Sequence, residues 1–180
     1  MPPTPSPRAR RSCLEEIKEI EATLAGRHLI PAVRQGNVDK LKYAVRLGVP
    51  VNAKNKCGCT ALICAGFEGK LDVIRYLVEE AGASVEVKDD DGWNALICAA
   101  HNGKLSVVKY LIEEAHSPLF AKVEDNRCAA TCAYLQGHVE VGRYIQKVYQ
   151  KAFGVILRRD LLQLEMLERS VMKSIFGHLV

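Results

Sequence analysis

The sequence predicts an all-α protein, a solenoid of tandem helix–turn–helix units with protruding β-hairpin turns and flanking capping helices. The main observation is an internal repeat, because residues 58–71 recur 34 positions later as residues 92–105. In both copies a glycine and a helix-capping residue precede one apolar run, and a second apolar run follows. One such unit cannot bury its apolar face alone, so the pattern predicts a stack of units.

Two further copies bring the number of units to four. A third copy follows at the same interval, and a fourth lies upstream within residues 29–52, at an interval shorter by one position. In the last copy Asn126 replaces the turn glycine and Cys128 replaces the helix cap, so we expect this unit to fray before the second and third. The predicted units cover residues 26–54, 55–88, 89–122 and 123–147, which together form one repeat domain over residues 26–147.

The elements of one unit follow from local chemistry. Gly58 and Gly92 stand where a tight turn needs a positive φ, and Thr60 and Asn94 stand where a helix N-cap belongs. A first helix should end at a glycine and a second amphipathic helix should follow it directly. The glycines in that position are Gly69 and Gly103.

The first helix of each unit carries small residues that allow close helix packing. These are Ala65, Ala99, Ala100 and Ala133. In the first unit Pro31 lies one turn into the expected helix, where it would remove a backbone hydrogen bond. We therefore expect that helix to begin near Pro31 itself.

The repeated frame is Gly-x-Thr-(Pro/Ala)-Leu-x-x-Ala-Ala-x-x-Gly-(His/Lys)-x-x-Val-Val-x-x-Leu-Leu, and it resembles the ankyrin repeat family over residues 26–147. The resemblance implies antiparallel helix pairs, protruding hairpins and a curved stack whose concave face binds proteins. The chain departs from the family at the Thr-Pro-Leu-His motif. Here Ala61 and Ile63 replace proline and histidine, so an apolar contact is expected instead of a polar link between repeats.

By this resemblance, partner-binding residues should lie outside the frame, on the hairpin tips and at the end of each first helix. In this chain they are Arg34, Gln35, Lys56, Cys59, Phe67, Glu68, Asp90, Asp91, Trp93, His101, Asn102, Glu124, Arg127, Leu135 and Gln136.

Trp93 is the strongest single candidate among them. It is the only tryptophan, and it follows the turn glycine at a position that faces the binding groove in the family. Interface hot spots are enriched in tryptophan because a partner removes a large apolar surface from water. The alternative is that the indole lies over its own repeat and shields the turn.

The two ends of the chain lie outside the repeats. Residues 1–11 are rich in proline and arginine, which is typical of a disordered leader, and residues 12–25 predict an N-terminal capping helix. Residues 148–180 predict an amphipathic segment, with an apolar face running from Leu157 to Ile175. This segment could cap the last repeat, pair with another helix, or lie on a membrane surface.

Composition limits the class of partner. The net charge of +4 comes from the two ends, and between them 16 basic residues face 18 acidic ones. A body without a basic excess is not expected to bind nucleic acid. No secretory signal or transmembrane segment is recognisable, so we expect a cytoplasmic protein, with the nucleus as the alternative.

Candidate chemistry is sparse. No set of nucleophile, base and orienting residue can be assembled, no phosphate-binding glycine motif occurs, and neither metal nor cofactor is expected. Cys64, Cys98 and Cys132 occupy the same position in three successive units, and we interpret them as small buried apolar residues. Cys57 and Cys59 lie in a turn, so oxidation would reach them first.

The sequence therefore predicts a non-enzymatic protein-interaction module that acts as a scaffold or adaptor. Two alternatives stay open: an adaptor or regulatory subunit tethered through its C-terminal amphipathic helix, and a redox sensor that uses its thiols.

Overall fold

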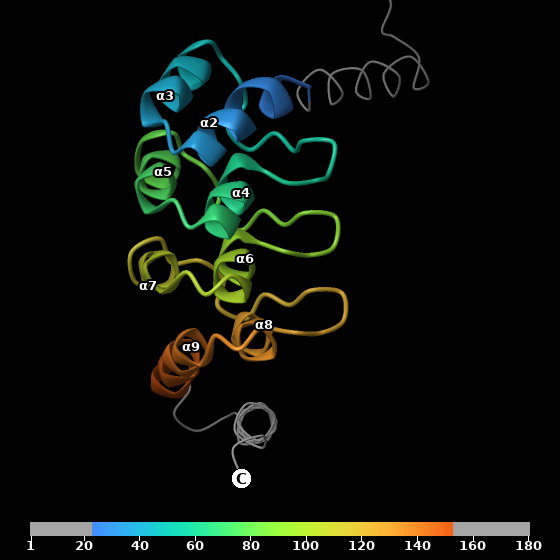
Figure 1. Ribbon diagram of the computed structural model, residues 1–180, viewed down its shortest axis with the longest axis vertical. Helices are drawn as coiled ribbons and strands as arrows, with labels where there is room; N and C mark the ends of the chain where they lie inside the picture. The colour runs from blue at the N-terminus through green and yellow to red at the C-terminus, as the bar shows by residue number, and fades with distance from the viewer. Residues whose placement is uncertain (1–22, 153–180) are drawn as a thin grey trace, which may run out of the picture.

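The computed structural model describes residues 23–152, which form a stack of four antiparallel helix pairs (Figure 1). The inner helices are α2 (Ile30–Gln35), α4 (Ala61–Glu68), α6 (Ala95–His101) and α8 (Ala129–Leu135). The outer helices are α3 (Val38–Arg46), α5 (Leu71–Arg75) with its π-helical continuation η2 (Tyr76–Glu80), α7 (Leu105–Glu113) and α9 (Val139–Ala152). Three long loops project from the inner helices, on the side away from the outer ones. The prediction of an all-α solenoid is confirmed.

The predicted flanking segments lie largely outside the described residues. Of the capping helix at 12–25, only the last residues are described; Thr23 and Leu24 are helical, and Leu24 packs against the core. The segment after Ala152, with its apolar face, is also outside them. Helix α9 itself continues past residue 147, the end that the sequence assigned to the last repeat.

Each projecting loop is closed by the same hairpin turn. A backbone N–H donates to the carbonyl four residues later, in the pairs Asn55–Cys59 (2.9 Å), Asp89–Trp93 (2.8 Å) and Val123–Arg127 (3.0 Å). The fourth residue of each turn has a left-handed φ: 72° at Gly58, 84° at Gly92 and 65° at Asn126. Asparagine tolerates this conformation better than most residues with a side chain, so the last turn forms without a glycine.

The helix caps follow the predictions. The Ile63 N–H donates to Thr60 Oγ1 (3.3 Å), and the equivalent bond of the next unit joins the Ile97 N–H to Asn94 Oδ1 (2.9 Å). Cys128 makes no such bond, which leaves α8 without a side-chain cap. The sequence reasoning missed one cap, on α3, where Asn37 Oδ1 accepts from the Lys40 N–H (2.9 Å).

The first unit differs in one detail from the prediction that its helix begins at Pro31. Pro31 does lie in the first turn of α2, but a π-helical turn, η1 (Ala25–Leu29), precedes it and continues the helix backwards. In a regular α-helix the proline ring would clash with the carbonyl one turn earlier. A widened turn before the proline is a common way to accommodate this.

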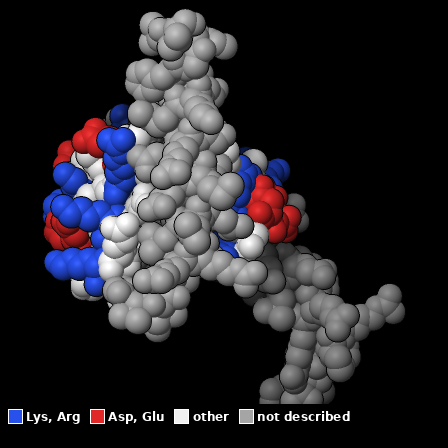
Figure 2. All heavy atoms as spheres, turned by 90° about the horizontal axis from the view of Figure 1, so that it is seen from below, with Lys and Arg blue, Asp and Glu red and all other residues white. Residues whose placement is uncertain are grey.

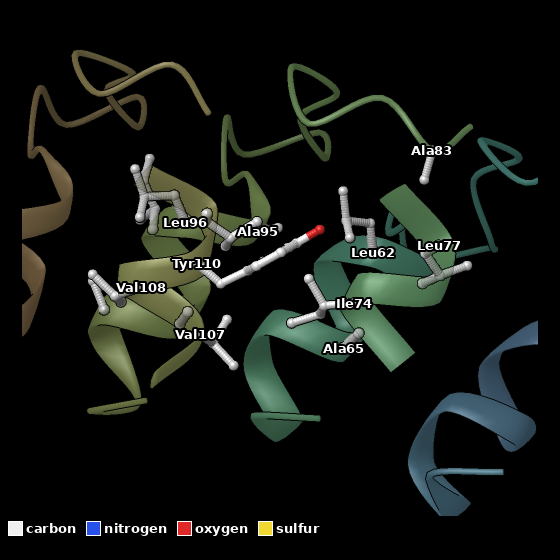
Figure 3. Close-up of a cluster of buried hydrophobic side chains, with 14 of the residues drawn as sticks. Leu62, Ala65, Ile74, Leu77, Ala83, Ala95, Leu96, Val107, Val108 and Tyr110 are labelled. Carbon is white, nitrogen blue, oxygen red and sulfur yellow. The ribbon is translucent and has the colours of Figure 1, made fainter. Parts of the chain in front are cut away.

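Neighbouring inner helices pack closely because their facing residues are small. A Cβ placed on Gly66 of α4 would lie 2.5 Å from the carbonyl oxygen of Ala95 at the start of α6. Ala65, Ala99 and Ala100 are all fully buried, as the sequence predicted. Figure 3 shows the core of these two units, where Ile74 and the Tyr110 ring lie between Leu62 and Ala65 on one side and Ala95 and Leu96 on the other.

A ladder of tyrosines ties the outer helices together. The Arg75 guanidinium lies 4.6 Å from the centre of the Tyr110 ring, and the Tyr110 hydroxyl donates to Glu79 Oε1 (3.0 Å). Arg75 also makes two bonds to Glu114, of 3.0 and 3.1 Å. The same stacking joins Lys42 to Tyr76 (5.4 Å) and Lys109 to Tyr144 (5.7 Å). Exposed cation–π contacts are worth about 0.5–1 kcal/mol each, so this ladder supplements the apolar core.

Compared with the preceding unit, the last unit has a larger residue on its inner helix and a smaller one on its outer helix. Tyr134 stands at the position that Ala100 holds in the preceding unit, and Gly142 stands at the position of Val108. The Tyr134 ring is fully buried, and its hydroxyl donates to Gln146 Oε1 (2.8 Å). A Cβ on Gly142 would lie 2.7 Å from two carbons of that ring, so the glycine provides the space that the tyrosine fills.

This exchange predicts a non-additive pair of mutations. Gly142→Val should destabilise the fold by about 1–3 kcal/mol, because it overpacks the space against Tyr134. Tyr134→Ala should also destabilise it, because it leaves a cavity. The double variant restores the alanine–valine pair of the preceding unit. Its loss of unfolding free energy should be smaller than the sum of the losses in the two single variants. Urea unfolding of all four proteins tests this; strictly additive losses would contradict it.

Candidate partner-binding face

The residues proposed for binding fall into adjacent rows along the stack. The inner-helix row holds the same position in each unit and consists of Arg34, Phe67, His101 and Leu135. One residue further on are Gln35, Glu68, Asn102 and Gln136, which form the polar row. The loop row consists of Cys59, Trp93 and Arg127, each directly after a left-handed turn residue. Because α4 packs on α6 and α6 on α8, each row runs through consecutive units.

The inner-helix row exposes two large apolar side chains. Phe67 is 53% exposed and Leu135 is 45% exposed, and His101 of the intervening unit lies between them. At the other end of the row Arg34 forms an ion pair with Glu68 (4.0 Å). The row is therefore apolar at its second and fourth positions and charged only at its first.

Trp93 joins the loop row to the inner-helix row. Its ring meets the His101 ring edge-to-face, with 5.1 Å between the centroids and 80° between the planes. The indole is half-buried and packs against the core. This arrangement agrees with the alternative in which the indole lies over its own repeat, although one part of its surface remains open to a partner.

The position of Trp93 is set by a residue that the sequence reasoning missed. Asp89 Oδ1 accepts from the Trp93 N–H (2.7 Å) and from the Asp91 N–H (3.1 Å). Asn55 makes the equivalent bonds to the N–H groups of Cys57 and Cys59, at 2.9 Å each. The signal was available, because these two residues occupy the same position in successive units and both can form an Asx turn.

His101 stands in an environment that disfavours its charged form. Burial lowers its pKa below the usual value, and the Arg127 guanidinium and His138 add to the effect. Arg127 is itself held by an ion pair with Asp125. The centre of the face is therefore an uncharged aromatic pair with a cation beside it.

The loop tips carry charges of both signs. Lys54 and Asp90 form an ion pair between neighbouring loops (3.1 Å), with side chains 43% and 73% exposed. Exposed pairs of this kind are worth about 0–1 kcal/mol, so they orient the loops more than they stabilise them. Lys56, Asp91 and Glu124 are exposed. Figure 2, seen along the stack, shows acidic and basic side chains close together on both flanks.

Two of the three repeated cysteines are buried and the third is half-buried, which supports their structural interpretation. Cys98 is 6% exposed and Cys132 is fully buried, while Cys64 is half-buried. Burial raises the pKa of Cys64 to about 12 and that of Cys132 to about 11, and raises that of Cys98 further. Since the thiolate is the reactive form, these thiols are poor nucleophiles.

The two turn cysteines are more accessible. Cys57 is exposed and Cys59 is half-buried. Burial and the nearby Asp89 carboxylate raise the pKa of Cys59, so that thiol is also protonated at neutral pH. Cys57 therefore presents the more open thiol of the two at the first loop tip.

Within residues 23–152, no group of three or more His, Cys, Asp or Glu side chains is placed to hold a metal ion. The helices of this part of the chain are also too short or too polar to span a membrane.

Comparison with known proteins agrees with the geometry. The family described as ankyrin repeats, in three copies, matches residues 29–121 and again residues 81–152. No curated protein matches the chain.

The lowered pKa of His101 predicts a pH dependence of stability. Below its unfolded pKa of about 6.5, the unfolded chain binds a proton that the folded protein resists. The free energy of unfolding should therefore be unaffected by His101 above that pH. It should decrease as the pH falls from there through the lower pKa of the folded state. In melting curves between pH 7.5 and 5, His101→Gln should remove part of this decline. An unchanged decline in the variant would contradict the assignment.

Proposed function

Because the chain belongs to the ankyrin repeat family, we propose that it is a non-enzymatic module that binds a partner protein through the inner-helix row and the loop row. Ankyrin repeats are generally protein-interaction modules, and the family is generally non-enzymatic. The finer statement, that this chain uses these two rows, rests on the side chains found there.

The observation that carries the proposal is the pair of exposed apolar side chains in one row. Phe67 and Leu135 lie on either side of the Trp93–His101 pair and expose about half of their surface. Full burial of such a side chain from complete exposure is worth about 1.5–3 kcal/mol, so covering the exposed half is worth about half of that. Two of them beside an indole form the kind of aromatic and aliphatic cluster that dominates binding energy in protein interfaces.

The support of these side chains also favours binding. Each stands on a helix whose neighbours pack directly against it, so its backbone is fixed before a partner arrives. A rigid surface loses little conformational entropy on association, and more of the burial energy then appears as affinity.

The experiment compares proteins captured from native extract by the full chain and by Phe67→Ser and Leu135→Ser variants. Each variant should bind the specific partner more weakly, with affinity reduced by about three- to tenfold. Leu47→Ser is a matched control, because Leu47 is 62% exposed but lies at the end of outer helix α3. Removing an exposed side chain should leave the melting temperature nearly unchanged in all three variants.

Trp93→Ala adds a second test of the same face. Because the indole is half-buried, this variant should lower both the affinity for the partner and the melting temperature. If every row variant keeps the partner at full affinity, the proposed face is wrong. The tethered-subunit alternative would then become the leading one, and deletion of residues 154–180 would test it.

A further inference from the structure

The spacing of the inner-helix row restricts the shape of what can bind to it. Packed helices lie about 8–10 Å apart, so successive members of the row are separated by about one such distance. Phe67, His101 and Leu135 come from α4, α6 and α8, which pack on each other in that order. A partner segment that contacts all three needs side chains that repeat on one face at about this same interval.

An α-helix meets this requirement. Seven residues advance a helix by about 10.5 Å and return the side chain to nearly the same face. An extended strand advances about 10 Å in three residues, but successive residues alternate between faces, so the middle side chain would point away. A polyproline II segment also repeats every three residues, with an advance of about 9 Å.

The width of the face favours the helix over polyproline II. The Trp93 ring, from the loop row, contacts the His101 ring on α6, in the inner-helix row. The surface available to a partner therefore spans both rows. A helix with its side chains is about 10–12 Å across and can touch both rows together. A single polyproline chain is thinner and would leave one row exposed.

The acidic residues next to Trp93 favour a basic residue on one side of the partner helix. Asp89, Asp90 and Asp91 form the tip next to Trp93, and the only base among residues 86–93 is Lys88. Lys88 reaches the carbonyl of Lys122 (3.4 Å), and Asp90 pairs with Lys54, which leaves the exposed Asp91 carboxylate for a partner. A basic residue next to the middle apolar side chain would meet it.

We propose that the partner segment is an amphipathic α-helix with apolar side chains at positions i, i+7 and i+14 and a lysine or arginine beside the middle one. The proposal rests on the proposed function and names the partner of that same face. The outer apolar side chains contact Phe67 and Leu135, and the middle one contacts the Trp93–His101 pair. The polar row then lies beside the helix, where Asn102 and Gln136 can bond to its polar residues.

The test uses synthetic helical peptides of about 21 residues, long enough to be partly helical alone. The first carries leucine at i, i+7 and i+14 with lysine beside the middle leucine. The second has the same composition with leucine at i, i+5 and i+10, which spreads the leucines around the helix. The third is proline-rich, with leucine at every third position. Titration of the full chain is followed by calorimetry and by the emission of Trp93, the single tryptophan.

The first peptide should bind at least about tenfold more tightly than either of the others, because the leucines of the second do not share one face and the third is too thin to touch the loop row as well. Phe67→Ser and Leu135→Ser should each weaken it by about three- to tenfold, and Leu47→Ser should not. Asp91→Asn should weaken it by about two- to fivefold, the range for an exposed ion pair.

Three results would overturn the proposal: equal binding of the first two peptides, tighter binding of the proline-rich peptide, or no binding of the first. If any of them occurs while Phe67→Ser still loses its partner from native extract, the helical partner is wrong and the binding face stands. If that variant also keeps its partner, the binding face itself is wrong.

Discussion

The close approach of the inner helices is the constraint on which the rest of the structure depends. Gly66 lies so near the carbonyl of Ala95 that a methyl group has no room between them, and buried alanines continue along α4, α6 and α8. Small facing residues let helix backbones approach, and the apolar side chains beside them then close into one core. The tyrosine ladder joins the outer helices of successive units.

The geometry of the proposed binding face is a consequence of this packing. A row of equivalent side chains keeps a regular spacing only where successive helices pack in the same way, and the exposed Phe67 and Leu135 stand on α4 and α8, which both pack on α6. The last unit is packed differently, since the large Tyr134 on α8 fills the space left by Gly142 on α9. The stack thus presents one continuous surface although its units differ in sequence.

Much of the fold could be predicted because the repeat marks each turn, cap and helix end locally. Thr60 and Asn94 cap their helices as expected, since a cap depends only on residues three positions apart. The environment of Trp93 could be narrowed only to two alternatives, because the choice depends on the contact with His101 across the unit and on the bond from Asp89. The widened turn before Pro31 and the pairing of Tyr134 with Gly142 also depend on contacts that a residue pattern does not specify.

The most direct test of this account is the unfolding free energy of Gly66→Ala, measured with urea. In an isolated helix this change should stabilise by about 0.5–1 kcal/mol, because glycine loses more conformational entropy than alanine on folding. If inner-helix contact governs the stack, the added methyl must instead push α4 from α6 and lower the stability by about 1–3 kcal/mol. A variant more stable than the original chain would contradict the central claim.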